Sequence, residues 1–244
     1  METNQGSLAD LAYQELKQRI LSLEFLPGQV VSDFKLREEL NMSRTPIKEA
    51  LMHLKSDGLI LDLGKKGYEV RRITEDDIID LFDAREGIEC AALKISMLHG
   101  ISPDVLEHLR HLNTQVAQAD EQRDYEKVFD FDSELHVTLL EASGNSRLIE
   151  YYRMILLQLR RMRLLTYFEK KLPKEAAKEH SLLFSALAEQ NTELALKTLS
   201  RHIQGTKEDY VRILRKSIRT DTDFVALRYL IRNNLEVQPE PSLG

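Results

Sequence analysis

The fold of the N-terminal region is decided by eleven residues, Asn41-Met42-Ser43-Arg44-Thr45-Pro46-Ile47-Lys48-Glu49-Ala50-Leu51. Ser43 is a typical helix N-cap residue. Pro46 falls in the first turn of the helix that would follow, where the missing N–H of proline costs nothing. The stretch therefore predicts a helix that begins at Ser43.

The two faces of this helix have different chemistry. Its inner face is apolar at the i, i+4, i+7 spacing of Ile47, Leu51 and Leu54. Its outer face begins with polar and cationic side chains, those of Arg44, Thr45 and Lys48. This is the end of a recognition helix that meets base edges and phosphates in the major groove. An ordinary capped surface helix would tolerate the same residues, so the flanking elements must decide.

Those flanking elements predict a winged helix-turn-helix. Amphipathic patterns indicate helices at 8–23 and 32–40, before the recognition helix. After it, 58–63 and 68–70 have the composition of two short strands, and 64–67 (Gly-Lys-Lys-Gly) has that of a turn. Two helices, a recognition helix and a hairpin with a basic tip are the order of elements in that fold. A basic turn alone is usually only solvated.

The winged helix-turn-helix arrangement predicts which residues contact DNA. The region that would bind, residues 1–72, has no net positive charge. The chain has a formal net charge of −6, but residues 1–72 hold 11 basic and 11 acidic side chains. Binding therefore requires the cations to face the duplex, and it should weaken strongly with salt. The predicted contacts are Lys35, Arg37, Ser43, Arg44, Thr45, Lys48, Lys65, Lys66 and Gly67.

Residues 8–72 resemble the GntR-type winged-helix regulators. The matching motif is Ser43 to Leu51, followed by Leu54, Asp57-Gly58-Leu59-Ile60 and Gly67. The chain departs from that family in two places. Phe34 stands where a DNA-contacting arginine is common, and Lys48 replaces the usual arginine of the recognition helix. Lysine lacks the bidentate fork that favours guanine, so base preference at that contact is expected to differ.

Composition bounds the rest of the molecule. At 244 residues the chain makes one large or two modest domains. Cys90 is the only cysteine, so no disulfide can form within the chain and a reducing compartment is expected. No apolar run approaches the roughly 20 residues of a membrane span, and the N-terminus lacks the apolar stretch of a signal peptide. The expected location is cytoplasmic.

A second, all-α domain is predicted from Thr74 onward, which makes the fold mainly α. The predicted domains are a winged helix-turn-helix at 1–72, a helical bundle at 73–235 and a disordered tail at 236–244. Gly, Pro and Asn positions divide the second domain into helices. They are predicted at 75–98, 102–121, 124–143, 146–169, 173–189, 192–218 and 221–235.

Within that domain, one carboxylate and three imidazoles are candidates for a metal site. Asp132 and His136 are at i, i+4 and therefore project from one face of one helix. His180 and His202 lie in two later helices. Together the four residues could bind one divalent cation, although scattered histidines are common and the spacing alone is a weak signal. His53, His99, His108 and His111 have no obvious companions in the sequence.

Residues 74–219 look like the FCD ligand-binding domain of FadR-like GntR regulators. The matching marks are residues 81–89 (LFDAREGIE), Asp132-x-x-Leu-His136 with Gly144-Asn145 after it, Glu179-His180, and His202. In metal-containing members, an aspartate and three histidines at these places bind a divalent ion. The resemblance thus implies that Asp132, His136, His180 and His202 bind zinc or nickel.

The resemblance also implies that a small carboxylate effector completes the coordination of the ion. Arg85 is a candidate clamp for that carboxylate because guanidinium offers a bidentate fork. A salt bridge from Arg85 to Glu89, one turn on, is an equally good interpretation. Arg163 and Asn145 are weaker candidates, since basic runs are usually solvated and Asn145 suits a helix cap.

Two classes of function remain. The first is a ligand-responsive transcriptional regulator, a homodimer that binds a palindromic operator and is not an enzyme. The second is a metal-dependent enzyme, or a metal-storage or metal-responsive module, with an accessory DNA-binding domain. The recognition helix and the wing lysines favour the first. A metal-dependent enzyme would need a general acid or base beside the site, and the sequence offers no evident one.

Overall fold

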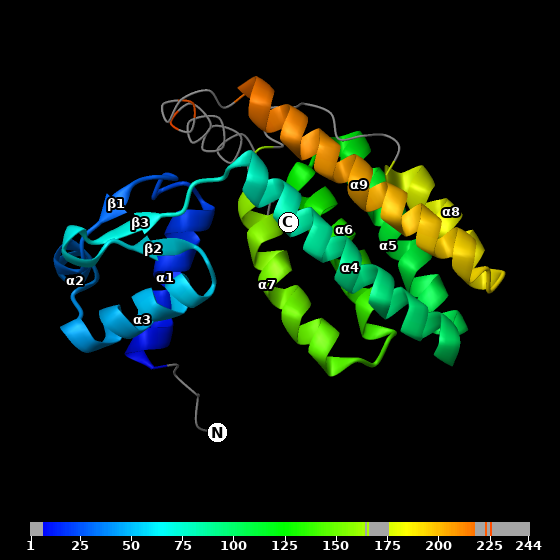
Figure 1. Ribbon diagram of the computed structural model, residues 1–244, viewed down its shortest axis with the longest axis horizontal. Coiled ribbons are helices and arrows are strands. Elements are labelled where there is room, and N and C mark those ends of the chain that lie inside the picture. The colour runs from blue at the N-terminus through cyan, green and yellow to red at the C-terminus, as the bar shows by residue number, and fades with distance from the viewer. Residues whose placement is uncertain (1–6, 164, 166–175, 218–222, 224, 226–244) are drawn as a thin grey trace, which may run out of the picture. The chain divides into compact units, whose positions relative to one another are not determined.

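The computed structural model describes residues 7–163, 165, 176–217, 223 and 225. The chain divides into two compact units. One spans residues 1–73 together with 218–244, and the other spans Thr74–Ser217. Each unit is described by itself below (Figure 1).

The first unit is a winged helix-turn-helix. Its three strands form one antiparallel sheet in the order β1-β3-β2. The elements are α1 (Leu8–Leu21), β1 (Val30–Val31), α2 (Asp33–Leu40), α3 (Arg44–Ser56), β2 (Ile60–Asp62), the 3-10 turn η1 (Gly64–Lys66) and β3 (Tyr68–Val70).

The core of this unit lies where α1 packs on α3. Both helices bury one apolar stripe, which includes Leu16 and Ile20 of α1 and Ile47, Leu51 and Leu54 of α3. The predicted helix–turn–helix order and hairpin are therefore confirmed. At α1 a capping box between Ser7 and Asp10 marks the N-terminus.

Three local details differ from the prediction. Ser43 is the N-cap of α3, but its side chain makes no capping hydrogen bond. The strand β1 was not predicted, because two residues are too short to show an alternating pattern. The first predicted helix ends at Leu21 instead of residue 23, since Leu23 adopts a left-handed φ of 57°.

The tip of the wing depends on a glycine. Gly67 has a φ of 96°, and a Cβ added there would lie 2.5 Å from the carbonyl oxygen of Val31. No side chain fits at that distance. Gly67 therefore lets β1 approach the hairpin, and its predicted importance has a structural cause in the wing itself.

The second unit is a bundle of helices. In chain order they are α4 (Glu75–His99), α5 (Pro103–Gln122), α6 (Tyr125–Glu141), α7 (Ser146–Met162), α8 (Ala176–Ala188) and α9 (Thr192–Ser217). Thr74 and Asp77 form a capping box at the start of α4, which begins where the second domain is predicted to begin. The ends of the two helices predicted around 163–175, most of the helix predicted at 221–235, and the tail at 236–244 lie outside the described residues.

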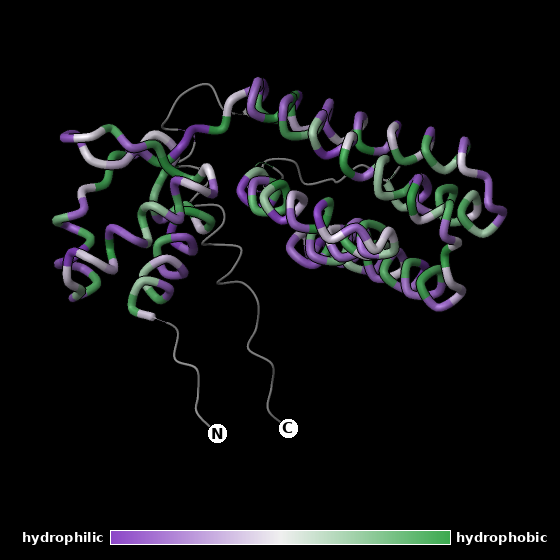
Figure 2. Tube along the Cα trace, turned by 60° about the horizontal axis from the view of Figure 1, so that its bottom comes forward, coloured by the Kyte–Doolittle hydropathy of each residue, from purple (hydrophilic) through white to green (hydrophobic). Residues whose placement is uncertain are grey.

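Amphipathic helices build the core of this bundle. Figure 2 shows hydrophobic and hydrophilic residues alternating along the long helices, as expected where each helix buries one face. The most extensive helix pairs are α5 with α6, α4 with α9 and α8 with α9. Along the part of the chain that the structure describes, no helix has the length and apolar character needed to cross a membrane.

Candidate metal centre and DNA-binding surface

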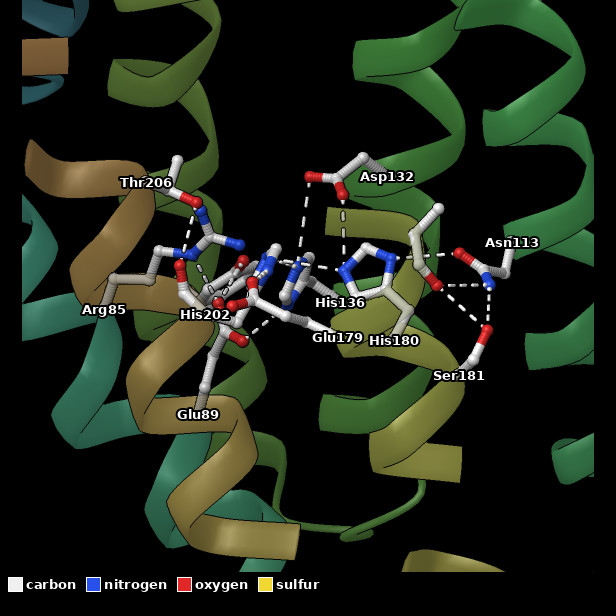
Figure 3. Close-up of polar contacts among 12 residues, drawn as sticks. Arg85, Glu89, Asn113, Asp132, His136, Glu179, His180, Ser181, His202 and Thr206 are labelled. Atoms are coloured by element: carbon white, nitrogen blue, oxygen red, sulfur yellow. Dashed lines mark hydrogen bonds and ion pairs between the residues drawn. The ribbon is translucent and has the colours of Figure 1, made fainter. Parts of the chain in front are cut away.

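The four predicted metal ligands lie together inside the bundle. Asp132 and His136 come from α6, His180 from the first half of α8 and His202 from the middle of α9. Each offers one ligand atom, and these atoms all lie within 4.8 Å of one another (Figure 3). The three histidines are buried, and Asp132 is partly exposed.

The imidazoles face one another through the same ring nitrogen. Nε2 of His202 lies 3.3 Å from Nε2 of His136 and 3.3 Å from Nε2 of His180. The carboxylate oxygens of Asp132 lie 3.9 Å from Nε2 of His136 and 3.6 Å from Nε2 of His180. Two nitrogens bound to one tetrahedral zinc ion are about 3.3–3.4 Å apart, given Zn–N bonds of about 2.0–2.1 Å. The spacing of the imidazoles thus fits a shared cation.

The opposite nitrogen of each imidazole meets an oxygen atom. Nδ1 of His136 lies 2.7 Å from a carboxylate oxygen of Glu89, on α4. Nδ1 of His180 lies 3.1 Å from Oδ1 of Asn113, on α5, and Nδ1 of His202 lies 3.1 Å from a carboxylate oxygen of Glu179, on α8. Such outer oxygen partners are the usual support of metal-binding histidines.

These oxygens determine where the imidazole protons lie. A carboxylate accepts hydrogen bonds, so Glu89 and Glu179 favour a proton on Nδ1 of their histidines. Asn113 presents its oxygen in the same way, because its amide nitrogen donates to the carbonyl of Ala177 and to the hydroxyl of Ser181. All three Nε2 atoms are then left with lone pairs that point at one another. That arrangement is electrostatically unfavourable unless a cation or a proton lies between them, so the residues present fit a metal ion.

The charges around the cluster support the same conclusion. Surrounding protein would by itself raise the pKa of Asp132, but His136, His180 and the Arg85 guanidinium hold that pKa below its ordinary value. Burial and the neighbouring His202 lower the pKa of His180 well below the usual range. An ionised carboxylate and a neutral imidazole are the protonation states in which these groups bind metals.

The predicted clamp Arg85 lies beside this cluster, on α4. It is buried, and its Nε donates to Glu89 at 2.6 Å, so the alternative salt bridge is present. Within the described part of the chain this is its one hydrogen bond, and its terminal amino groups remain available to a ligand. Figure 3 shows that the guanidinium extends toward the histidines. The salt bridge therefore does not exclude a role in holding an anion.

The other two effector candidates have structural roles. Arg163 pairs with Glu126 at 3.1 Å and with Asp130 at 3.7 Å, both on α6. Oδ1 of Asn145 accepts hydrogen bonds from the backbone N–H groups of Arg147 and Leu148, and so caps α7. No contact joins either side chain to the histidines among the described residues, and their role toward an effector stays a prediction.

The sequence interpretation missed the outer oxygen of Asn113 and the role of Glu89 toward His136. Asn113 is four positions after Leu109, on the buried side of α5. A polar residue on the apolar face of a predicted helix is a sequence signal that could have identified it. Glu179 was noted only as part of a motif. The other four histidines, His53, His99, His108 and His111, are all exposed.

The first unit exposes most of the predicted DNA contacts. Arg44 is the first residue of α3. The recognition helix contacts the wing at β2, so the two predicted DNA-binding elements are close in space. The exposed members of the predicted set are Lys35, Ser43, Arg44, Thr45, Lys48, Lys65 and Lys66, while Arg37 and Gly67 are partly buried.

Family comparisons agree with both units. Residues 8–70 match the family described as bacterial regulatory proteins, gntR family, and residues 80–205, just over half of the chain, match the FCD domain. The chain belongs to the GntR family of transcriptional regulators. Proteins of this family bind operator DNA and small-molecule effectors, FCD domains often bind a metal ion, and the named relatives are regulators instead of enzymes.

Individual relatives of this GntR-family regulator are distant. It is 29% identical over 201 residues to an uncharacterized HTH-type transcriptional regulator from Streptomyces ambofaciens, over 82% of this chain and 84% of that protein. It is 24% identical over 198 residues to the transcriptional repressor RspR of Escherichia coli, over 80% of this chain and 86% of that one.

Solved structures show the same fold. E. coli McbR/YncC has a TM-score of 0.69 at 20% identity, over 85% of this chain and 98% of that one. A putative GntR regulator from Rhodococcus has a TM-score of 0.67 at 22% identity, over 84% of this chain and 97% of that one.

Proposed function

We propose that this GntR-family protein is a ligand-responsive regulator that binds a palindromic operator as a homodimer. Its helical unit holds a divalent metal, zinc or nickel, through Asp132, His136, His180 and His202. A small organic acid completes the coordination of that ion and changes the affinity for DNA. Arg85 contributes a guanidinium that pairs with the effector's carboxylate.

One observation supports the metal above all. Three imidazoles turn the same nitrogen toward one point, and each has an oxygen acceptor behind it. Imidazole nitrogens select zinc, nickel or a similar ion over magnesium. A bound ion of this kind supplies a positively charged centre with open positions for a carboxylate.

The chemical class of the effector follows from the net charge of the ion and its protein ligands. Asp132 is the one carboxylate of the ligand set, so three neutral imidazoles and one anion leave a divalent ion with net positive charge. The adjacent Arg85 is paired with the carboxylate of Glu89 through its Nε, so the pair adds no net charge, but the terminal amino groups of the guanidinium can still donate to an anion. A site of this composition favours an anionic ligand.

The dimer follows from the DNA-binding geometry. A single winged helix reads only a few base pairs, so useful specificity needs two half-sites related by the symmetry of the protein. The neutral charge of residues 1–72 strengthens the argument, since non-specific attraction to phosphate contributes little.

A thermal-shift screen of small organic acids on zinc-loaded protein tests the proposal. A true effector raises the melting temperature of the zinc-loaded protein, because it binds the folded state. The same acid must then change operator affinity in a DNA titration. The proposal is wrong if zinc binds and no acid of a broad panel alters either quantity. If zinc alone changes operator affinity to its full extent, the ligand is the metal itself.

A further inference from the structure

Glu89 has three hydrogen-bonding partners on one buried carboxylate. Its Oε1 accepts from Nε of Arg85 at 2.6 Å and from the hydroxyl of Tyr152 at 2.7 Å. Its Oε2 lies 2.7 Å from Nδ1 of His136. Glu89 itself is 3% exposed, and its partners lie on α4, α6 and α7. Figure 3 shows Arg85 and Glu89 extending from α4 toward the histidines.

The contacts of Glu89 define its charge. Its Oε1 lies 2.6 Å from Nε of Arg85, whose guanidinium is always a cation, and both side chains are buried. The group is therefore a carboxylate that only accepts hydrogen bonds. Oε1 is occupied by two donors, so Oε2 is the oxygen that faces the imidazole and requires a proton on Nδ1 of His136.

We infer that Glu89 is a positioning residue, which holds His136 in its metal-binding tautomer and joins that histidine to Arg85 through one carboxylate. This inference rests on the proposed metal site and adds a residue that sets the tautomer of one of its ligands. With the proton on Nδ1, the Nε2 lone pair of His136 faces Asp132, His180 and His202. Arg85 and His136 are 51 positions apart in the chain, yet one carboxylate contacts both. A ligand that moves the guanidinium of Arg85 therefore also acts on the Glu89 carboxylate, which orients the imidazole of His136.

The inference makes a specific demand on the chemistry at position 89. In Glu89→Gln, the amide has nearly the same shape but carries one donor group. If its NH₂ faces His136, it donates to Nδ1 and moves the imidazole proton to Nε2, which removes a metal ligand. If the NH₂ faces the other way, it meets the N–H of Arg85 and the hydroxyl of Tyr152. Neither orientation reproduces the native set of hydrogen bonds.

The first test uses the wild-type protein without metal. Nitrogen NMR of protein labelled in its histidine rings distinguishes protonated from unprotonated ring nitrogens, and His136→Asn assigns the signals. We expect His136 to have a protonated Nδ1, the nitrogen that faces Glu89. An unprotonated Nδ1 on His136 overturns the inference, whatever the variants do.

The second test compares zinc affinity by competition with a chelator. Glu89→Gln should weaken zinc binding about 10–100-fold, as is typical when a partner of a metal ligand is changed. Tyr152→Phe is the matched control, because it removes one hydrogen bond from Glu89 and leaves the one to His136. It should change zinc affinity by less than about threefold. Equal affinities of wild type and folded Glu89→Gln contradict the inference.

The two proposals fail in different ways. If wild-type protein retains no zinc, the proposed metal function is wrong, while the NMR measurement still decides whether Glu89 sets the tautomer. If Glu89→Gln does not fold, the wild-type spectrum alone decides. If zinc binds and His136 has the other tautomer, only the role of Glu89 is wrong.

Discussion

Nε2 of His180 lies 3.3 Å from Nε2 of His202, although the two residues are 22 positions apart in the chain. Their other ring nitrogens face oxygens of Asn113 and Glu179. Two lone pairs at this distance repel each other. The bundle therefore brings together groups that repel one another in the absence of a cation, and this relationship gives rise to the first two predictions.

Replacing His180 by alanine should abolish stoichiometric metal binding. The substitution removes one of the three imidazoles and leaves the winged helix unchanged. The metal content of wild type and variant is measured by elemental analysis after loading with zinc or nickel and desalting. His108→Ala, which removes an exposed histidine beside Glu134, is the control and should retain the wild-type content. Wild-type protein with well under one ion per chain would show that the histidines are structural.

Removing the metal should lower thermal stability. Binding to the folded state stabilises by about 2.7 kcal/mol when free metal is at 100 times the dissociation constant. The melting temperature of zinc-loaded protein should therefore fall when a strong chelator is added. His180→Ala should show no such fall. A chelator effect of equal size in that variant would mean that the stabilising ion binds elsewhere.

The DNA contacts should separate into two kinds. Arg44→Ala should cost about 1–3 kcal/mol on the operator if that side chain reads bases, and much less on unrelated DNA. Lys66→Ala should weaken binding evenly across sequences and reduce its dependence on salt. Lys94→Ala, in α4 of the other unit, is a charge-matched control. Titrations at several salt concentrations measure all three, and unchanged affinity in the first two would contradict the assigned surface.

The functional unit should be a two-fold dimer. Light scattering at micromolar concentration should give twice the chain mass of 28.2 kDa. One dimer should bind one palindromic site, while a half-site should bind much more weakly. A monomer that binds a half-site one to one, with the affinity measured for the full site, would exclude the dimer.

Tyr13 should make the stability of the protein dependent on alkaline pH. Burial raises the pKa of its hydroxyl, and Asp57, which accepts from it at 2.6 Å, raises it further. A group with a raised folded-state pKa stabilises the fold fully below its unfolded pKa, about 10 for tyrosine, and loses that contribution as pH rises above it. Tyr13→Phe should cost about 0.5–1.5 kcal/mol at pH 8.

Urea unfolding at pH 8 and pH 10.5 measures this effect. The difference in the free energy of unfolding between wild type and Tyr13→Phe should shrink at the higher pH. A difference that stays constant would mean that the hydroxyl is not preferentially protonated in the folded state.

The recognition helix and the four candidate ligands could be predicted because their signals are local or match a family motif. Asp132 and His136 are one helical turn apart, and the Ser43–Leu51 motif is contiguous. The residues behind the ligands could not be predicted in this way. Glu89 is 47 positions from His136, and Asn113 is 67 from His180, so only the packing of different helices brings them into contact. Glu89 also had a satisfactory local partner in Arg85, which concealed its second role.

The adjacent positions of Glu179 and His180 have a consequence for the rotational setting of α8. His180 supplies a candidate ligand, and Glu179 lies behind His202 of α9. An α-helix turns about 100° per residue, so a rotation of α8 by one position would remove both groups from the centre at once. Both contacts of α8 with the centre therefore depend on the same rotational setting of that helix.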